Sequence, residues 1–358
     1  MIPLIDLGPG YSIPRIILGG WQLSAGHANR TLEREELFSR WDAFLDQGLN
    51  TFDCADIYTG VEATIGEYVR RRRAAGQAPP QVHTKFVPDL AALPTLDRPG
   101  VERIIDRSLA RLGLEQLDLV QFHWWDYRVE GYVETLGFLG DLAREGKIRL
   151  VGLTNFDTPR LRELLATGVP VASMQLQYSV LDQRPARRLA AACQGSNVAL
   201  LCFGTLAGGF LSKSWLGQTD PANLPNRSLV KYRLVIDDLG GWLVFQKILA
   251  VLARIAERHG VEVSTVAVRV MLDRPGVAAV IVGMPSRDRA RELSSAFSLR
   301  LTDAARLELA EATGATPGPI GDVYTAEREL GGRHAAIMRY DLNARAGDGS
   351  PLQRQRPR

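Results

Sequence analysis

Cysteine is scarce in this chain of 358 residues, where it occurs three times. Cys54, Cys193 and Cys202 form no C-x-x-C pair, and three thiols cannot all be paired with one another. The sequence therefore predicts no disulfide framework or zinc ribbon of the kind that paired cysteines build. Unpaired thiols are typical of a reducing compartment, and we expect a cytoplasmic protein.

Long apolar runs and an excess of one charge are also missing. No stretch reaches the ~18 apolar residues of a membrane span, so we expect no membrane association. The opening "MIPLIDLGPGYSIPR" lacks the basic and apolar regions of a signal peptide. The formal net charge is only +3. The one tight basic run, 70–73, closes a predicted helix, where cations suit the helix dipole, so no nucleic-acid partner is expected.

Short apolar runs alternate with helical patterns along most of the chain. The strand candidates are 15–20, 50–55, 82–86, 117–125, 148–156, 172–179, 199–206 and 277–284. The helical patterns between them include 34–49, 101–114, 132–147, 158–168, 242–260 and 286–297. Such alternation predicts parallel βαβ units. An open doubly wound sheet is conceivable, but eight units favour an α/β fold of the (β/α)8 TIM barrel type.

Two segments fall outside this repeat. Residues 207–240 are predicted to form a long loop after strand 7, and 315–358 form a C-terminal tail rich in Gly and Arg. We expect residues 1–345 to form a single barrel domain and 346–358 to be disordered. Because long loops at the C-terminal face of a barrel commonly carry binding residues, 207–240 and the tail around 321–343 are candidate substrate walls.

Polar side chains are concentrated where the predicted strands end. Asp53 lies in the apolar run "NTFDCA", where an unpaired carboxylate costs several kcal/mol. Lys85 and His123 end the next two strands, so all three are expected to converge at the barrel mouth. Lys85 would neutralise Asp53 and lower the pKa of nearby Tyr58. Tyr58 could then act as general acid toward a carbonyl oxygen, to which His123 would supply a second hydrogen bond.

Each of these residues also has a plainer explanation. An Asp at a strand end is usually a cap or a surface residue, and a Lys there is usually solvated. His123 lies between two aromatic residues and could be a hydrogen-bonded core histidine. The joint placement of all four residues, rather than any one of them, favours a catalytic site.

The segment "GLNTFDCADIYTGVEATIGE" (48–67) resembles the FD-x-A-x-x-Y-x-x-x-E-x-x-x-G signature of the aldo-keto reductase family. The matching positions are Asp53, Ala55, Tyr58, Glu62 and Gly66. The segments "HTKF", "LDLVQFHWWD", "GLTNF" and "QLQY" resemble further family elements, with Thr154 where serine is usual. The resemblance extends from about residue 13 to about residue 300. It implies a (β/α)8 barrel and hydride transfer between a nicotinamide cofactor and a small carbonyl or alcohol, such as an aldehyde, a ketone or a sugar.

The resemblance also implies roles for individual residues. Tyr58 would be the general acid/base, with Asp53 and Lys85 tuning it and His123 orienting the substrate. Asn155 and Gln175 would hold the nicotinamide carboxamide, and Tyr178 would stack on its ring. The other expected cofactor-binding residues are Gly20, Trp21, Thr154, Leu206, Ser212, Gly283, Ser286, Arg289 and Glu292. The expected substrate walls are Trp21, Trp124 and Trp125, and no metal site is expected.

The segment "IVGMPSRDRARELSSAF" (281–297) resembles the family's element for the adenosine phosphate. We expect Ser286 to cap the following helix, Arg289 to bind the 2′-phosphate and Glu292 to contact the adenine. Gly283 stands where some members have lysine, and Leu293 replaces the usual asparagine. The segment therefore favours NADP(H), with NAD(H) use possible.

Two other functions stay open at this point. A barrel lyase could use Lys85 as a Schiff base, although that chemistry gives no reason for Asn155 or Gln175. A cofactor-binding regulatory subunit would keep the barrel and act through a partner. The sequence does not determine the physiological substrate, the direction of the reaction or the oligomeric state.

Overall fold

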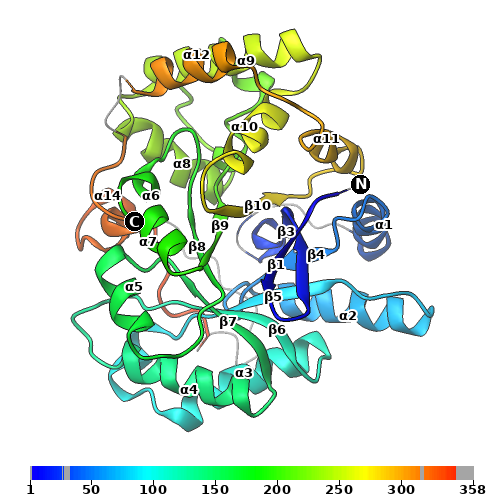
Figure 1. Ribbon diagram of the computed structural model, residues 1–358, viewed down its shortest axis with the longest axis vertical. Helices are drawn as coiled ribbons and strands as arrows, with labels where there is room; N and C mark the ends of the chain where they lie inside the picture. Colours follow the sequence, from blue (N-terminus) through cyan, green and yellow to red (C-terminus); the bar gives the residue numbers. More distant parts are fainter. Residues whose placement is uncertain (1, 26, 28–32, 315–317, 344–358) are drawn as a thin grey trace.

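The computed structural model describes residues 2–25, 27, 33–314 and 318–343; the predicted disordered segment 346–358 lies outside them. Eight parallel strands form a closed barrel (Figure 1), which confirms the predicted (β/α)8 fold. The strands are β3 (Ile16–Gly19), β4 (Thr51–Asp53), β5 (Gln81–Phe86), β6 (Leu117–Phe122), β7 (Ile148–Thr154), β8 (Ser173–Gln177), β9 (Ala199–Phe203) and β10 (Val277–Gly283). Strand β10 pairs with both β9 and β3 and thereby closes the sheet.

The strand register aligns the polar strand ends. Asp53 pairs with His83, Lys85 with Gln121, and Thr154 with Gln175. Because side chains alternate between the two faces of a strand, residues two apart share a face. The polar ends of β4 to β8 therefore meet at one rim of the barrel.

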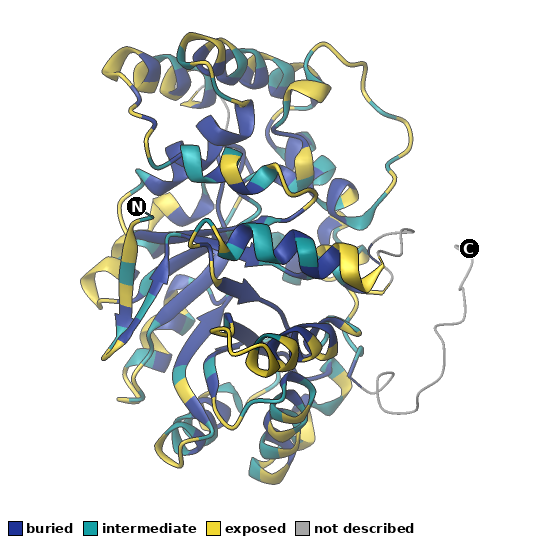
Figure 2. Cartoon of the chain, turned by 90° about the vertical axis from the view of Figure 1, so that its right-hand side faces the viewer, coloured by how far each residue is buried: buried dark blue, intermediate teal, exposed yellow. Residues whose placement is uncertain are grey.

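Helices cover the outside of the barrel, and Figure 2 shows their buried faces turned inward and their exposed faces outward. They are α1 (Arg34–Leu45), α2 (Val61–Ala74), α3 (Arg98–Leu112), α4 (Tyr132–Arg144), α5 (Thr158–Leu165), α6 (Arg184–Arg187), α7 (Leu189–Gly195), α9 (Trp242–His259), α10 (Val263–Leu272), α11 (Arg289–Ser295) and α12 (Asp303–Gly314). Local signals fix several helix starts. Asp97 and Asp157 cap α3 and α5 by accepting hydrogen bonds from the backbone three residues on.

An antiparallel hairpin, β1 (Leu4–Gly8) and β2 (Tyr11–Pro14), precedes the barrel and was not predicted. Buried side chains of the hairpin, including Leu7 and Ile13, form one cluster with Ile17 and Leu119 of the barrel interior. The hairpin therefore belongs to the core. The run "LIDLGPGYSIP", with a Gly-Pro-Gly turn between two apolar stretches, carries the signal.

The segment after β9, predicted as a long loop, is partly helical. It contains η3 (Ala207–Gly209), η4 (Lys213–Trp215) and α8 (Arg227–Asp238), and Asn226 caps α8 through the backbone N–H of Leu229. Other short helices are η1 (Trp21–Leu23) and η2 (Leu90–Thr95) near the strand ends, and α13 (Thr325–Arg328) and α14 (Arg333–Ala336) in the tail. The tail thus returns to the barrel with ordered structure.

No single helix in the described part of the chain is long and apolar enough to cross a membrane. The pair α8 and α9, bent by 100°, passes by length and composition only.

Candidate active site

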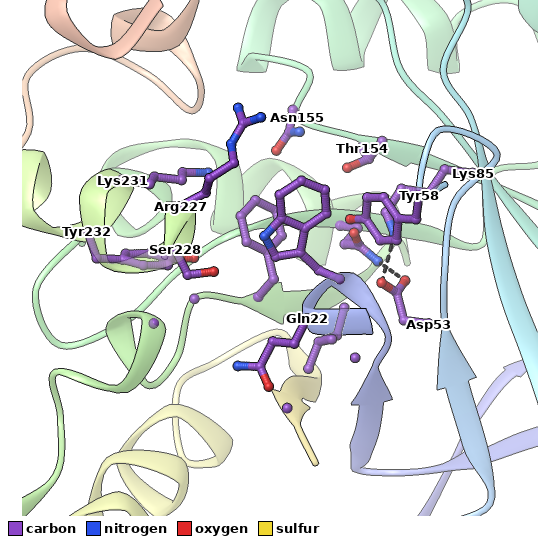
Figure 3. Close-up of a pocket in the computed structure, with 18 of the residues that line it drawn as sticks. Gln22, Asp53, Tyr58, Lys85, Thr154, Asn155, Arg227, Ser228, Lys231 and Tyr232 are labelled. Carbon is purple, nitrogen blue, oxygen red and sulfur yellow. Dashed lines mark hydrogen bonds and ion pairs between the residues drawn. The ribbon is translucent and has the colours of Figure 1, made fainter. Parts of the chain in front are cut away.

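A cavity of about 660 Å³ opens at the C-terminal ends of the barrel strands. This volume falls within the range of small-molecule sites. The close-up in Figure 3 shows Asp53, Tyr58 and Lys85 on one side and four residues of α8 on the other. The cavity therefore lies between the barrel rim and the segment after β9.

Asp53 and Lys85 form a buried ion pair at the rim. Lys85 Nζ donates to Asp53 Oδ2 and to the backbone oxygen of Cys54, both at 2.7 Å. Asp53 Oδ1 accepts from Gln175 Nε2 at 2.6 Å and from Gln121 Nε2 at 3.2 Å. The carboxylate inside an apolar strand is thus fully hydrogen-bonded, as a buried charge requires.

Tyr58 lies against this pair. The Lys85 ammonium is 5.0 Å from the centroid of the Tyr58 ring. Burial raises the pKa of Tyr58 above its ordinary value, and the charge and hydrogen bond of Lys85 only partly oppose this. The predicted lowering of that pKa is therefore wrong, because sequence alone did not reveal how strongly the surrounding protein desolvates the phenol.

The protonation of Lys85 follows from the same geometry. Burial acts to lower the pKa of Lys85, but the charge and hydrogen bond of Asp53, together with the charge of Tyr58 when it ionises, outweigh this effect and raise that pKa. The side chain is therefore an ammonium ion at neutral pH. Its Asp53 partner holds it in place, pointing toward the Tyr58 ring.

His123 is 2% exposed and lines the same cavity. Its Nδ1 lies 3.2 Å from the backbone oxygen of Thr154, which can only accept, so Nδ1 carries a proton. Burial, assisted by the charge of Arg328, lowers the pKa of His123 to about 3. The neutral ring therefore has an unprotonated Nε2, and that atom has no partner within the described structure.

Further unpartnered polar atoms lie beside His123. Thr154 Oγ1 and Asn155 Oδ1 are buried and make no hydrogen bond to the described residues. Asn155 adopts a left-handed backbone with φ 62°, which is uncommon outside glycine. Gln175 uses its amide nitrogen on Asp53, so its oxygen is the group that can receive a donor. These atoms fit a planar carboxamide, which offers both donors and an acceptor.

The predicted cofactor residues divide into two groups. Those that line the cavity are Trp21, Thr154, Asn155, Gln175, Leu206, Gly283 and Arg289. Those outside its lining are Gly20, Tyr178, Ser212, Ser286 and Glu292.

Local contacts account for the second group. Gly20 donates to the backbone of Asp53, Tyr178 is 2% exposed in the core, and the Ser212 hydroxyl bonds Gly209. The predicted cap at Ser286 is wrong, because Asp288 precedes α11 and no side chain caps it.

Glu292 bonds a neighbour rather than lining the cavity. It accepts from Arg289 and from the hydroxyl of Ser264, and Arg289 also donates to that hydroxyl at 2.9 Å. Arg289 is therefore held at the cavity edge by an ion pair with Glu292.

The three predicted wall tryptophans lie in different places. The Trp21 ring is 4.9 Å from the Tyr58 ring, and the Trp125 ring packs edge-on against His123 at 4.4 Å. Both line the cavity. Trp124 lies outside its lining: it is fully buried, and its indole donates to the backbone of Val129. Trp124 is a core residue because it points away from the barrel axis, one position on from His123.

Late segments of the chain supply cavity residues that the sequence did not single out. They include Arg227, Ser228, Lys231 and Tyr232 of α8 and Tyr324, Met338 and Arg339 of the tail. The Ser228 hydroxyl lies 2.7 Å from Nε2 of His27, so α8 contacts the loop after β3. The sequence placed both segments near the site, but nothing local marked these residues.

Arg328 fastens the tail to the barrel rim. It donates to the backbone oxygens of Trp124, Trp125 and Asn155 at 2.7, 3.1 and 2.8 Å. Its guanidinium also lies 5.0 Å from the centroid of the Tyr324 ring. These contacts hold Tyr324 against His123, with ring centroids 5.5 Å apart.

No cluster of three or more His, Cys, Asp or Glu side chains suited to a metal ion occurs among the described residues.

Comparison with known proteins identifies the family. The aldo/keto reductase family model matches residues 15–312. Flagellar radial spoke protein 5 of Chlamydomonas reinhardtii is 30% identical over 257 residues, which cover 61% of this chain and 49% of that protein. The NADH-specific methylglyoxal reductase of Escherichia coli K12 is 26% identical over 315 residues, 82% of this chain and 92% of that protein.

A solved structure agrees at the level of the fold. A thermostable aldo-keto reductase in complex with the inhibitor epalrestat has a TM-score of 0.68 and 23% identity, covering 87% of this chain and 100% of that one. The family model spans most of the chain, barrel included. The protein therefore belongs to the aldo-keto reductase family.

Proposed function

We propose that this protein is an oxidoreductase that transfers hydride between NADP(H) and a small carbonyl or alcohol, with Tyr58 as general acid/base. The observation that carries the proposal is the convergence of Asp53, Lys85, Tyr58 and His123 on one cavity. The rim of this cavity also carries buried polar atoms without a partner among the described residues, such as Thr154 Oγ1 and Asn155 Oδ1, which suit a carboxamide.

The chemistry divides between cofactor and protein. A nicotinamide bound here would supply or accept the hydride. In the reductive direction Tyr58 donates its proton to the carbonyl oxygen as that oxygen gains negative charge. The resulting phenolate would be stabilised by the ammonium of Lys85, which Asp53 orients. The raised pKa of Tyr58 keeps its proton in place at neutral pH until an acceptor arrives.

For His123 we infer a task that differs from the predicted donation to the carbonyl oxygen. Its Nε2 carries a lone pair, so in this tautomer it cannot donate to a carbonyl oxygen. It can instead accept a hydrogen bond from the hydroxyl group of an alcohol. We infer that His123 orients the alcohol, as product of reduction or as substrate of oxidation.

The cofactor assignment rests on two places in the cavity. Asn155 Oδ1 and the Gln175 amide oxygen would accept from the carboxamide nitrogen. Arg289 would face the 2′-phosphate, which makes NADP(H) the preferred cofactor. Because Arg289 is already paired with Glu292, and one relative is named as NADH-specific, NAD(H) stays the competing choice.

The Schiff-base alternative has less support. A Schiff base needs a neutral amine, whereas Lys85 is an ammonium ion with two short hydrogen bonds and a raised pKa. Borohydride trapping with carbonyl substrates should accordingly leave Lys85 unlabelled. A labelled Lys85 peptide in a mass spectrum would favour a lyase.

The direct test has two steps. Fluorescence titration with NADPH and NADH measures which cofactor binds, and turnover of aldehydes and ketones is then followed with the better one. Tyr58→Phe should abolish turnover and leave the cofactor Kd unchanged. Unchanged kcat would contradict the acid role, and a wild-type protein that binds cofactor without turning over any carbonyl would favour a regulatory subunit.

A further inference from the structure

Only some of the cations that line the cavity are paired with a carboxylate. The lining contains Lys85, Arg227, Lys231, Arg289 and Arg339, whereas Asp53 is its only acidic residue among the described positions. Asp53 neutralises Lys85, and Glu292, just outside the lining, neutralises Arg289. The excess positive charge is therefore located on α8 and the tail, opposite the Tyr58 side of the cavity (Figure 3).

Lys231 is the cation of this group that lies among aromatic rings of the cavity. Its ammonium lies 4.9 Å from the centroid of the Phe203 ring and 5.8 Å from that of Tyr324. The Tyr324 ring in turn is 5.5 Å from the His123 ring. The Tyr324 ring therefore contacts both the Lys231 ammonium and the His123 ring, and it links the two across the cavity.

Lys231 also lacks a charged partner. Within the described residues its Nζ has ring contacts but no hydrogen bond or ion pair. Burial lowers the pKa of Lys231, and the two carboxylates that oppose this, Glu327 and Asp182, are both ion-paired to Arg184. Ring faces compensate a desolvated ammonium only in part, so an anion entering the cavity would be attracted to Lys231.

Helix geometry keeps this charge in the cavity. Arg227 and Lys231 are four residues apart on α8 and therefore share one face, where two like charges repel each other. Arg227 is directed to the backbone oxygen of Ile337 at 2.7 Å, toward the tail. Lys231 lies beside Tyr324 and has no such hydrogen bond among the described residues.

We propose that Lys231 binds an anionic group on the substrate, a carboxylate or a phosphate, while Tyr58 and His123 engage its carbonyl or hydroxyl group. The inference rests on the proposed function and adds the substrate class to it: short oxo acids, hydroxy acids or phosphorylated carbonyl compounds.

Matched substrates test the charge directly. Succinic semialdehyde and butanal have four carbons each and differ in one carboxylate, while glyceraldehyde 3-phosphate and glyceraldehyde differ in one phosphate. We expect wild-type kcat/KM to favour an anionic member, and the pair that shows the preference identifies the group. Lys231→Met should reduce that preference roughly 10- to 100-fold, mainly through KM, because a desolvated charge pair is lost.

Two variants control the experiment. Lys231→Arg keeps the charge and should retain part of the preference, which separates charge from folding. Lys247→Met removes an exposed lysine of α9 outside the cavity and should change neither constant. Equal kcat/KM for charged and neutral partners in wild type, or an unchanged ratio in Lys231→Met, would overturn the inference.

Measuring cofactor binding distinguishes a role of Lys231 in binding the substrate from a role in binding the cofactor. If Lys231→Met weakens NADPH binding as strongly as it weakens the anionic substrate, Lys231 serves the cofactor and the inference is wrong. If wild type reduces no carbonyl at all, the proposed function fails. Calorimetry with succinate on wild type and Lys231→Met then still decides whether Lys231 binds an anion.

Discussion

Glu327→Gln should lower the free energy of unfolding by about 3 kcal/mol at pH 7, a magnitude that follows from the pKa of Glu327. Glu327 is 1% exposed and accepts two hydrogen bonds from Arg184, at 2.9 and 3.0 Å. Arg184 also bonds Asp182, so one guanidinium joins the loop after β8 to the tail helix α13. The amide keeps the shape of Glu327 and removes its charge.

The magnitude can be worked out from the carboxyl group itself. Burial acts to raise the pKa of Glu327, but the charge and hydrogen bonds of Arg184, together with the charge of Lys231, lower it to about 2. The ordinary value is 4.5, and each pKa unit corresponds to 1.36 kcal/mol, which gives about 3 kcal/mol. Truncating one partner of a buried ion pair typically costs a similar amount.

The sign of the pH dependence provides a second check. Because the pKa of Glu327 is depressed by folding, its stabilisation is fully present above the unfolded pKa of 4.5. It is lost as the pH falls from 4.5 toward the folded value near 2. The difference in unfolding free energy between wild type and Glu327→Gln should therefore be constant near neutral pH and shrink below pH 4.5.

Urea unfolding monitored by tryptophan fluorescence measures both effects. Glu308→Gln is the matched control, because Glu308 also contacts two arginines, Arg254 and Arg258, but on the exposed surface of α12. Exposed ion pairs contribute little, so this control should leave the urea midpoint unchanged. Equal losses in the two variants, or a difference that persists unchanged at pH 3, would refute the reasoning.

Three further substitutions test the site. Lys85→Met should lower kcat by roughly 10²–10⁴-fold with little change in the NADPH Kd, measured by steady-state kinetics and fluorescence titration; near wild-type kcat would exclude the ion pair from the chemistry. Arg289→Ala should raise the Kd of NADPH more than that of NADH, and an equal rise would remove the 2′-phosphate assignment. Gly204→Ala should lower the thermal midpoint and weaken cofactor binding, because φ is +74° and the new methyl carbon would lie 2.4 Å from the Tyr232 hydroxyl; wild-type stability would show that the loop shifts freely.

The barrel was predictable because its signals are local. Each strand is a short apolar run between helical patterns, and runs of that kind are typical of strands covered on both faces. The rim residues followed from the same signals, since Asp53, Lys85 and Asn155 lie where predicted strands end. Parallel register then brings strand ends together without further information.

The other half of the cavity was not predictable at residue level. His27 and Ser228 are 201 positions apart, and Arg184 and Glu327 are 143 apart. No periodicity or spacing reports such contacts. The sequence indicated which segments would form the wall, but the side chains on it became apparent only in three dimensions.

Protonation states were missed for the same reason. The sequence predicts a cationic neighbour for Tyr58 and hence a lowered pKa, but burial has the larger effect and raises the pKa of Tyr58. The sequence also predicts His123 as a donor to the substrate, yet its Nδ1 proton is engaged by the backbone of Thr154. The pKa of Tyr58 depends on burial, and the tautomer of His123 depends on a backbone oxygen from another strand.

The barrel rim and the opposite cavity wall, formed by α8 and the tail, should respond differently to substitution. The groups assigned to proton transfer lie on barrel strands and the loop after β4, bonded mainly to one another. The groups facing them come from α8, which contacts the loop after β3 through Ser228 and His27, and from the tail, which is joined to the barrel through Arg184 and Arg328. Substitutions on α8 that face the cavity, such as those at Lys231, should therefore alter substrate preference while kcat for neutral carbonyls is retained. Loss of kcat on every substrate after such a change would mean that wall and rim are energetically coupled.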